Sequence, residues 1–358
     1  MVKLLDAAVV ELADALDSKS SGSDTVSVRP RPAAPKKDTL ARVSFFGIGA
    51  GGVENPVAFR CKQNQRQCGF IQQERKLDKL LIVDGHNLLF QMFYGMPARI
   101  VSKEGKPIQG VIGFIGGLLK IIKMTEPTHV VVLFDGEHEN FRAELNPDYK
   151  KNRIDYSHVE EDNNPFSQLP LIYKALEVLN VAYFEENEYE VDDIIASYVY
   201  GYGKQIEIVI SSFDSDYFQL IGDNVSVLRY RGKNTVICDK AYVLEKFGIV
   251  PEFYADYKSL TGDGADNIRG ADHIGMVTAK KLINEFGSLE DVISNLSQIS
   301  SERIRLSILN NEQRLKNNYR LIKLKDIGKM PVTLFDAVFT YNGLTTVEVL
   351  DRLGLTIK

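Results

Sequence analysis

From Lys79 onward, short apolar runs alternate with segments of helical periodicity, and this alternation is the strongest constraint on the fold. The predicted strands are KLLIVD (79–84), THVVVLFD (128–135), VAYFE (181–185), IEIVISS (206–212) and a hairpin over 225–239, and the predicted helices lie at 111–122, 170–180 and 191–202. Strands that alternate with helices predict an α/β domain with a mostly parallel sheet and helices on both faces. Beyond Ala241 the pattern becomes helical.

The first 78 residues differ from the rest. Apolar residues between Leu4 and Leu16 have the spacing of one amphipathic helix, and the Ser- and Pro-rich stretch 18–38 is typical of a disordered linker. We therefore expect residues 1–78 to form a largely disordered extension.

Two patterns in this extension suggest functions that we reject. GIGAGG (47–52) matches a dinucleotide-binding fingerprint, but Pro56 interrupts the helix that should follow it. Cys61 and Cys68 have no second pair of Cys or His residues nearby, which argues against a zinc site. With only three cysteines and no run near the ~18 apolar residues of a membrane span, the chain fits a reducing cytoplasm and no membrane.

Acidic side chains gather at the ends of predicted strands and the starts of predicted helices. Residues 1–78 carry 12 basic and 9 acidic residues, whereas the remainder carries 31 basic and 39 acidic ones. Nine carboxylates occupy five such segments: Asp84, Asp135, Glu190, Asp192, Asp193, Asp214, Asp216, Asp263 and Asp266. The carboxyl ends of parallel strands meet at one edge of a sheet, so we expect these side chains to converge.

Nine carboxylates in one cleft repel one another unless cations neutralise them. Oxygen ligands without His or Cys favour Mg²⁺ or Mn²⁺ over zinc. The alternative is that each residue caps a helix or forms a turn, and this alternative is strongest for Asp193 and Asp263. It explains single residues better than it explains all five segments together.

Several motifs also resemble one known family. LLIVDGHNLLF, VVLFDGEHENFRAEL, YEVDDIIAS, SSFDSDYFQL and LTGDGADNIRGADHIGMVTAKKL occur in this order over residues 79–330. They resemble the bacterial 5′→3′ exonuclease (flap endonuclease) family, which includes the first domain of DNA polymerase I and free-standing relatives. The residues after 330 are too few for a polymerase domain.

The resemblance implies a domain organisation. A PIN/resolvase-like α/β nuclease core would occupy 79–245, and a helical, SAM-fold-like DNA-binding part with a helix-hairpin-helix would occupy 246–345. Residues 346–358 would form a C-terminal tail.

The resemblance also implies two or more Mg²⁺ or Mn²⁺ ions. One site would use Asp84, Asp135, Glu190, Asp192 and Asp193, and the second would use Asp214, Asp216, Asp263 and Asp266. Two metal ions can activate water and stabilise the leaving oxygen in phosphodiester hydrolysis.

Basic residues of FRAELNPDYKKNR match a family pair near the scissile phosphate. Arg142 and Lys150 would be catalytic and Arg153 would bind DNA, whereas the alternative is a solvated basic loop. The following stretch 154–169 is acidic and departs from the family, which leaves open whether an arch threads a 5′ single strand.

NIRGADHIGMVTAKKLINEFGSL (267–289) resembles the family's helix-hairpin-helix. DNA contacts would come from Gly275, Val277, Thr278, Lys280 and Lys281, with K⁺ as a cation at the hairpin. Gly275 is expected to permit the tight hairpin, and His273 replaces the usual first hairpin glycine. The alternative is a helix pair that serves only packing.

The resemblance thus implies a monomeric, metal-dependent 5′→3′ exodeoxyribonuclease or flap endonuclease. Its substrates would be nicked, flapped or 5′-ended DNA in replication and repair, and RNA–DNA hybrids if it removes primers; it would work in the cytoplasm, at the nucleoid. Two alternatives remain: a catalytically silent DNA-binding relative, and a metal-dependent phosphatase.

Overall fold

The computed structural model describes residues 78–96, 98–136, 142 and 145–355, and the structural statements below concern those residues. The predictions made for residues 1–77, including the amphipathic helix, the linker and the two rejected patterns, lie outside them.

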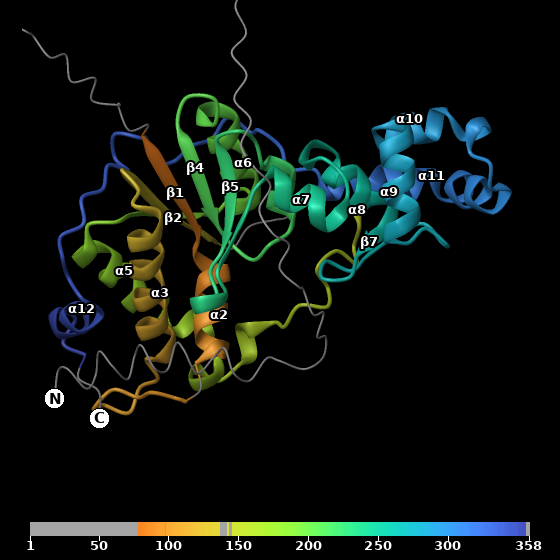
Figure 1. The fold of residues 1–358 in the computed structure, drawn as a ribbon. Helices are drawn as coiled ribbons and strands as arrows, with labels where there is room; N and C mark the ends of the chain where they lie inside the picture. Colours follow the sequence, from red (N-terminus) through yellow and green to blue (C-terminus); the bar gives the residue numbers. More distant parts are fainter. Residues whose placement is uncertain (1–77, 97, 137–141, 143–144, 356–358) are drawn as a thin grey trace, which may run out of the picture. The chain divides into compact units, whose positions relative to one another are not determined.

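Six strands form one sheet in the order β3-β2-β1-β4-β5-β6 (Figure 1). They are β1 (Lys79–Asp84), β2 (His129–Asp135), β3 (Ala182–Glu186), β4 (Glu207–Ser211), β5 (Val225–Arg229) and β6 (Val236–Cys238). Neighbouring strands are parallel except for the β5–β6 hairpin. The predicted mostly parallel α/β sheet is confirmed, and its strands begin and end close to the predicted positions.

Alternate residues of β1 serve two hydrophobic cores. Leu81 and Val83 face one cluster, which contains residues of α2 (Gly85–Gly95), α3 (Gln109–Thr125) and α5 (Leu169–Leu179). Leu80 and Ile82 face the other cluster, which contains α6 (Val191–Tyr202). Helices therefore cover both faces, as expected for a parallel sheet whose strands are buried.

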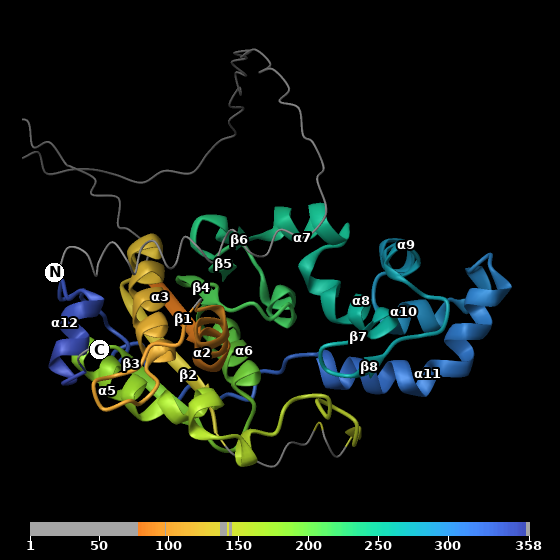
Figure 2. The ribbon, with the colours of Figure 1, turned by 90° about the horizontal axis from the view of Figure 1, so that it is seen from below.

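A helical part follows β6. Its elements are α7 (Lys240–Phe247), α8 (Tyr254–Thr261), the short strands β7 (Gly262–Asp263) and β8 (Ile268–Arg269), α9 (Met276–Phe286), α10 (Leu289–Ser294) and α11 (Glu302–Ile322). Figure 2 shows α8 to α11 grouped around β7 and β8. Buried Leu260, Leu282 and Ile308 join this part to the same cluster as α6.

After α11 the chain returns to the α/β part. The Tyr198 hydroxyl donates to the carbonyl of Val332, and the amide of Val130 donates to the carbonyl of Ala337. The chain then forms α12 (Thr346–Arg352), which lies beside α3 and α5 (Figure 2).

Within the segment predicted as a C-terminal tail, 346–358, residues 346–352 form the helix α12. A capping box between Thr345 and Glu348 starts α12, and Val349 and Leu350 bury their side chains in the core. The helix has only seven residues, too few for its periodicity to stand out in the sequence.

The acidic stretch after Arg153 forms three short 3₁₀ helices, Tyr156–His158, Glu161–Asn163 and Pro165–Gln168. Tyr156 and Phe166 pack edge-on against Phe90 of α2. None of the helices described here combines the length and the apolar character needed to cross a membrane.

Candidate active site

Asp84 ends β1 and lies at the carboxyl edge of the sheet. One carboxylate oxygen caps α2 by accepting from the amide of Asn87 (3.0 Å), and the other accepts from the Ser212 hydroxyl after β4 (3.0 Å). Burial, with a contribution from the charge of Asp135, raises the pKa of Asp84 to about 7. Asp84 is therefore both a helix cap and a buried carboxylate that a cation would stabilise in its charged form.

Asp135 ends the neighbouring strand, and it fixes the start of α6. Its Oδ1 accepts from the amide of Val191 (2.8 Å). This bond brings the EVDD motif, 56 residues further along the chain, to the end of β2. Parallel pairing of β1 with β2 sets Asp135 beside the edge that carries Asp84.

Two basic residues hold Glu190. The Arg142 guanidinium and the Lys150 ammonium (3.1 Å) donate to different oxygens of its carboxylate. Burial opposes ionisation of Glu190, but these two cations outweigh it and lower its pKa. Glu190 is consequently charged at neutral pH.

Arg142, predicted beside a scissile phosphate, is instead 1% exposed. It donates to Glu190, to Asp193 (3.0 Å) and to the carbonyl of Leu321 (2.8 Å) at the end of α11. Asp193 also accepts from the amide of Lys325 (2.9 Å). Arg142 and Asp193 therefore connect the acidic residues at the start of α6 to the end of α11 and the residues that follow it.

Asp192 faces a different partner. Tyr217, in the 3₁₀ helix Asp216–Leu220, donates its hydroxyl hydrogen bond to Asp192 Oδ1. Burial raises the pKa of Asp192 well above its usual value, although Lys150 acts in the opposite direction.

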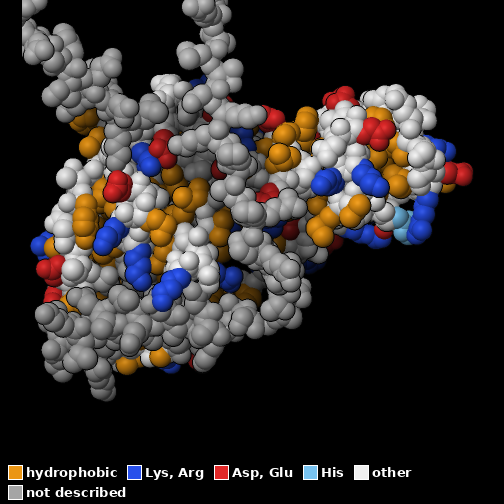
Figure 3. Space-filling model, in the orientation of Figure 1, with side chains coloured by type: hydrophobic (Ala, Val, Ile, Leu, Met, Phe, Trp, Pro, Cys, Tyr) orange, Lys and Arg blue, Asp and Glu red, His pale blue; other side chains and the backbone are white. Residues whose placement is uncertain are grey.

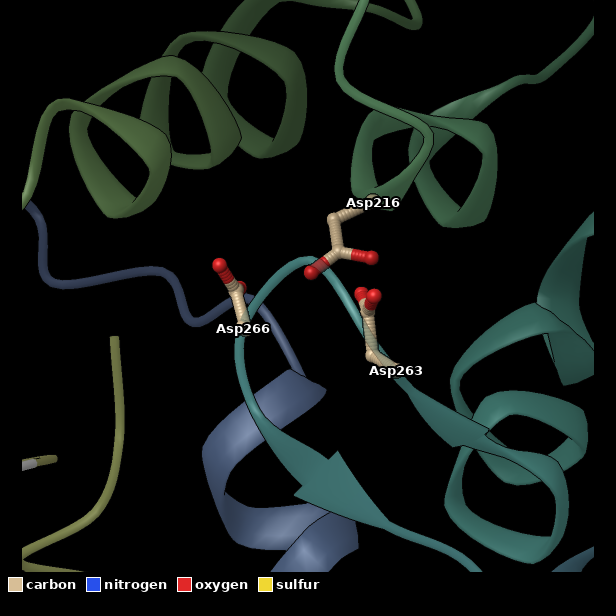
Figure 4. A group of neighbouring side chains, drawn as sticks. All are labelled: Asp216, Asp263 and Asp266. Atoms are coloured by element: carbon tan, nitrogen blue, oxygen red, sulfur yellow. The ribbon is translucent and has the colours of Figure 1, made fainter. Parts of the chain in front are cut away.

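A second acidic set comprises Asp216, Asp263 and Asp266. One oxygen of each carboxylate lies within 4.8 Å of the others, and Figure 4 shows the three side chains converging. Asp216 comes from the segment after β4, whereas Asp263 ends β7 and Asp266 lies in the turn between β7 and β8. The structure thus brings together three of the four residues predicted for the second site.

Asp214, the fourth, is adjacent to this set. Its Oδ1 accepts from the amide of Asp216 (2.8 Å), and its own amide donates to the Ser212 hydroxyl (3.0 Å). The negative charge of Asp214 acts on both Asp84 and Asp192. It therefore lies between the two predicted sites.

Lys258 of α8 is buried against the second set. Its ammonium donates to both Asp216 and Asp263. Burial disfavours the ammonium, but the two carboxylates overcome this and raise its pKa. Even so, burial raises the pKa of Asp216 to about 7. One lysine thus offsets only part of the negative charge.

This donor set fits hard divalent cations. All ligands offered are carboxylate oxygens, which Mg²⁺ and Mn²⁺ prefer. The raised pKa values of Asp84, Asp192 and Asp216 indicate buried negative charge that lacks sufficient compensation.

Lys150 connects the two acidic sets. Its ammonium contacts Glu190, while its amide donates to the carbonyl of Asp266 (3.1 Å). The residue adopts a left-handed conformation (φ 56°). Arg153, three residues on, pairs with the Asp266 carboxylate (2.9 Å).

The predicted hairpin precedes α9, but Gly275 does not take the left-handed conformation. Gly275 is extended (φ −90°), and His273 has the positive φ of 65°. The expectation that Gly275 permits the turn is therefore wrong. Its open surroundings instead allow a close approach to the backbone at the start of α9.

Exposed residues surround this helix start. Val277, Lys280 and Lys281 are exposed and Thr278 is partly exposed, while buried Leu282 and Ile283 anchor α9. Figure 3 shows Lys and Arg side chains at the surface of the helical part. The surface that the sequence predicted for DNA contacts is thus accessible.

Three residues of the site were not predicted from the sequence: Ser212, Tyr217 and Lys258. Ser212 and Tyr217 lie inside the SSFDSDYFQL motif, and Lys258 lies five residues before Asp263. Their hydrogen-bonding side chains beside the acidic motifs are the sequence signal for them.

Comparison with known proteins defines the class. The model for the N-terminal resolvase-like domain of 5′-3′ exonucleases matches residues 79–248, and the model for their C-terminal SAM fold matches residues 249–343. The chain therefore belongs to the 5′-3′ exonuclease family.

Individual relatives fall into two groups. The thermostable DNA polymerase I of Thermus aquaticus is 36% identical over 248 residues, which cover 69% of this chain and 28% of that protein. The chain thus spans little more than a quarter of that relative. A 5′-3′ exonuclease of Aquifex aeolicus is 31% identical over 68% of this chain and 81% of its own length.

A solved structure has the same fold. T5 5′-exonuclease with bound divalent metal ions (zinc) is 25% identical and superimposes with a TM-score of 0.58. The superposition covers 76% of this chain and 96% of that one. The predicted core, followed by a helical SAM-fold part, is thereby confirmed.

Proposed function

We propose that this protein hydrolyses DNA phosphodiesters with Mg²⁺ or Mn²⁺, as a 5′→3′ exonuclease and 5′-flap endonuclease. The observation that carries the proposal is the grouping of the Asp216, Asp263 and Asp266 carboxylates in a chain of the 5′-3′ exonuclease family. The charges of Asp135 and Asp214 also act on both Asp84 and Asp192, so these carboxylates belong to the same acidic region. The T5 5′-exonuclease with divalent ions bound supports metal dependence.

The residues divide into roles. Asp84, Asp135, Glu190 and Asp192 would hold one divalent ion, and Asp214, Asp216, Asp263 and Asp266 would hold a second, partly through water. When bound, such ions activate water and neutralise charge on the scissile phosphate. Lys150 is the proposed catalytic cation, because it is partly exposed beside Glu190 and adjoins both sets.

Arg142 and Asp193 are proposed to position the site. Their mutual ion pair is almost fully buried, so neither is presented to a substrate. Arg142 instead fixes Glu190 and ties the acidic edge to the end of α11. Removing one partner would leave the other as an unpaired buried charge, which is strongly destabilising.

DNA binding is proposed for Arg153 and for the hairpin with the start of α9. Gly275, Val277 and Thr278 would present backbone amides to a phosphate, with Lys280 and Lys281 beside them. The proposal also includes K⁺ binding at the hairpin and RNA–DNA hybrids as further substrates. The protein is proposed to be monomeric and to work in the cytoplasm, at the nucleoid.

The test uses a labelled 5′-flap duplex and a blunt duplex, each with Mg²⁺, Mn²⁺ or EDTA. Cleavage at the flap junction with Mg²⁺ and none in EDTA is expected, and product lengths separate exonuclease from endonuclease action. A flap with an RNA 5′ end tests whether RNA–DNA hybrids are cleaved, and omission of K⁺ tests the cation at the hairpin. Light scattering tests the monomeric state. Metal binding without cleavage would contradict the proposal and favour a silent DNA-binding relative.

The matched variant is Asp135→Asn with Asp192→Asn. Each substitution removes one negative ligand, whereas DNA affinity depends mainly on basic groups elsewhere. We expect cleavage to be abolished and DNA affinity to be equal or higher. Wild-type rates in this variant would contradict the metal assignment, and hydrolysis of a small phosphomonoester alone would favour a phosphatase.

A further inference from the structure

Tyr217 is a fully buried tyrosine whose hydroxyl reaches the acidic edge. It follows Asp216 directly, and its side chain is 0% exposed. The hydroxyl donates to Asp192 Oδ1 on the first turn of α6.

The neighbours of Asp192 have other partners. Arg142 and Lys150 hold Glu190, while Arg142 and a backbone amide hold Asp193. Among the side chains that the structure describes, Tyr217 alone donates a hydrogen bond to the Asp192 carboxylate. Without it, the charge of Lys150 would still act on Asp192, but no hydrogen bond from a described side chain would fix the rotation of this carboxylate.

The same contact spans the two acidic sets. Asp192 belongs to the set at the sheet edge, whereas Tyr217 shares a 3₁₀ turn with Asp216 of the second set. The hydrogen bond therefore ties the start of α6 to the backbone that carries Asp216.

On the basis of the proposed function, we infer that Tyr217 is a positioning residue for divalent-cation binding. Its hydroxyl orients the Asp192 carboxylate and holds the two acidic sets together. Hydrogen-bond partners of metal ligands commonly change metal affinity by about 10- to 100-fold when removed. Loss of this hydroxyl should therefore weaken cation binding without altering the DNA-binding surface.

Tyr198 provides a matched control. It is also 0% exposed, but its hydroxyl donates to the carbonyl of Val332 (2.6 Å), and none of the described carboxylates hydrogen-bonds to it. Tyr217→Phe and Tyr198→Phe each remove one buried hydroxyl. A general packing effect should appear in both variants, whereas a positioning effect on Asp192 should appear only in the first.

The experiment titrates the metal-free full chain with Mn²⁺ by isothermal titration calorimetry. Tyr217→Phe is expected to raise the Mn²⁺ dissociation constant by about tenfold or more, and Tyr198→Phe by less than about twofold. DNA affinity in EDTA should be the same in both variants and in the wild type. The Mg²⁺ concentration for half-maximal cleavage should rise in Tyr217→Phe alone.

A double-mutant cycle covers the case in which Tyr217→Phe also lowers stability. If Tyr217 acts through Asp192, the substitution should have no further effect on Mn²⁺ affinity in the Asp192→Asn background. An equal effect in both backgrounds, or wild-type Mn²⁺ affinity in Tyr217→Phe, would overturn the inference. If the wild-type protein binds Mn²⁺ but does not cleave DNA, the proposed function is contradicted. The Mn²⁺ dissociation constants of the variants and the wild type would still test the role of Tyr217.

Discussion

Lys150 is the proposed catalytic cation and Lys281 is a proposed DNA-binding residue, and the two lysines differ in their surroundings. Lys150 is held beside Glu190 with an 18% exposed side chain, whereas Lys281 is exposed on α9. A cation that meets charge developing in the transition state affects turnover more than affinity. An exposed cation near backbone phosphates affects affinity and its salt dependence.

We therefore expect Lys150→Ala to slow single-turnover cleavage by about 10²–10³ with little change in DNA affinity. Lys281→Ala should weaken DNA binding and reduce its salt dependence, with an unchanged rate at saturating enzyme. Rates with Mg²⁺ and dissociation constants in Ca²⁺ separate the two effects. Equal losses of affinity and unchanged rates in both variants would refute the catalytic assignment of Lys150.

The raised pKa of Asp84 predicts that the free energy of unfolding of the metal-free protein depends on pH. With its folded pKa raised to about 7, Asp84 keeps a proton that the unfolded chain has already lost, so metal-free stability falls as pH rises through this window. Asp84→Asn cannot ionise and should escape this loss. The melting temperature of the variant minus that of the wild type should therefore increase from about pH 5 to about pH 8 in EDTA. If the difference in melting temperature is the same at both pH values, the pKa of Asp84 is not raised in the folded protein.

At the scale of elements, the sequence predicted the six strands of the sheet and three helices of the α/β part, but it did not predict α2 (Gly85–Gly95). Strands β1 to β4 were predicted from short, largely continuous apolar runs, and helices α3, α5 and α6 were predicted from longer segments with a helical pattern. The short α12 was missed, and so were the 3₁₀ helices of the acidic stretch. The 3₁₀ helices are too short to show a period, and α12 spans only seven residues although a capping box starts it.

Helix α12 should contribute measurably to stability. Leu350 is 4% exposed in the cluster with α3 and α5, so Leu350→Ala should lower the free energy of unfolding by about 2–5 kcal/mol. Leu309→Ala on α11 is the matched control, because Leu309 is 54% exposed, and it should change stability by less than about 0.5 kcal/mol. Urea unfolding measures both. Equal values for the two variants would show that α12 does not stabilise the core.

At the scale of the whole molecule, the first family motif begins at Lys79, and the sequence before it has no pattern that predicts a core. A truncated protein that begins at Arg75 should therefore fold and cleave a 5′-flap duplex at the wild-type rate. Circular dichroism and the cleavage assay test this expectation. Failure to fold would show that residues 1–74 stabilise the nuclease.

The sequence by itself determined the α/β class, the helical second part and the acidic residues at strand ends, because these follow from local periodicity and from the geometry of parallel sheets. It also indicated the family through five ordered motifs. It could not determine which carboxylate meets which partner. Arg142 turned inward to Glu190 and Asp193, and Lys258 reached Asp216 and Asp263.

These partners are far apart in the chain or on different elements, so only tertiary packing decides their distances. Arg142 is 179 positions away in the sequence from Leu321, whose carbonyl it contacts at the end of α11. Tyr217 is 25 positions away from Asp192, to which its hydroxyl donates a hydrogen bond. Burial of such pairs then sets the pKa values, because desolvation depends on what covers a group. The sequence therefore specified the chemistry of the site, and the fold specified which groups remain available to a cation or a phosphate.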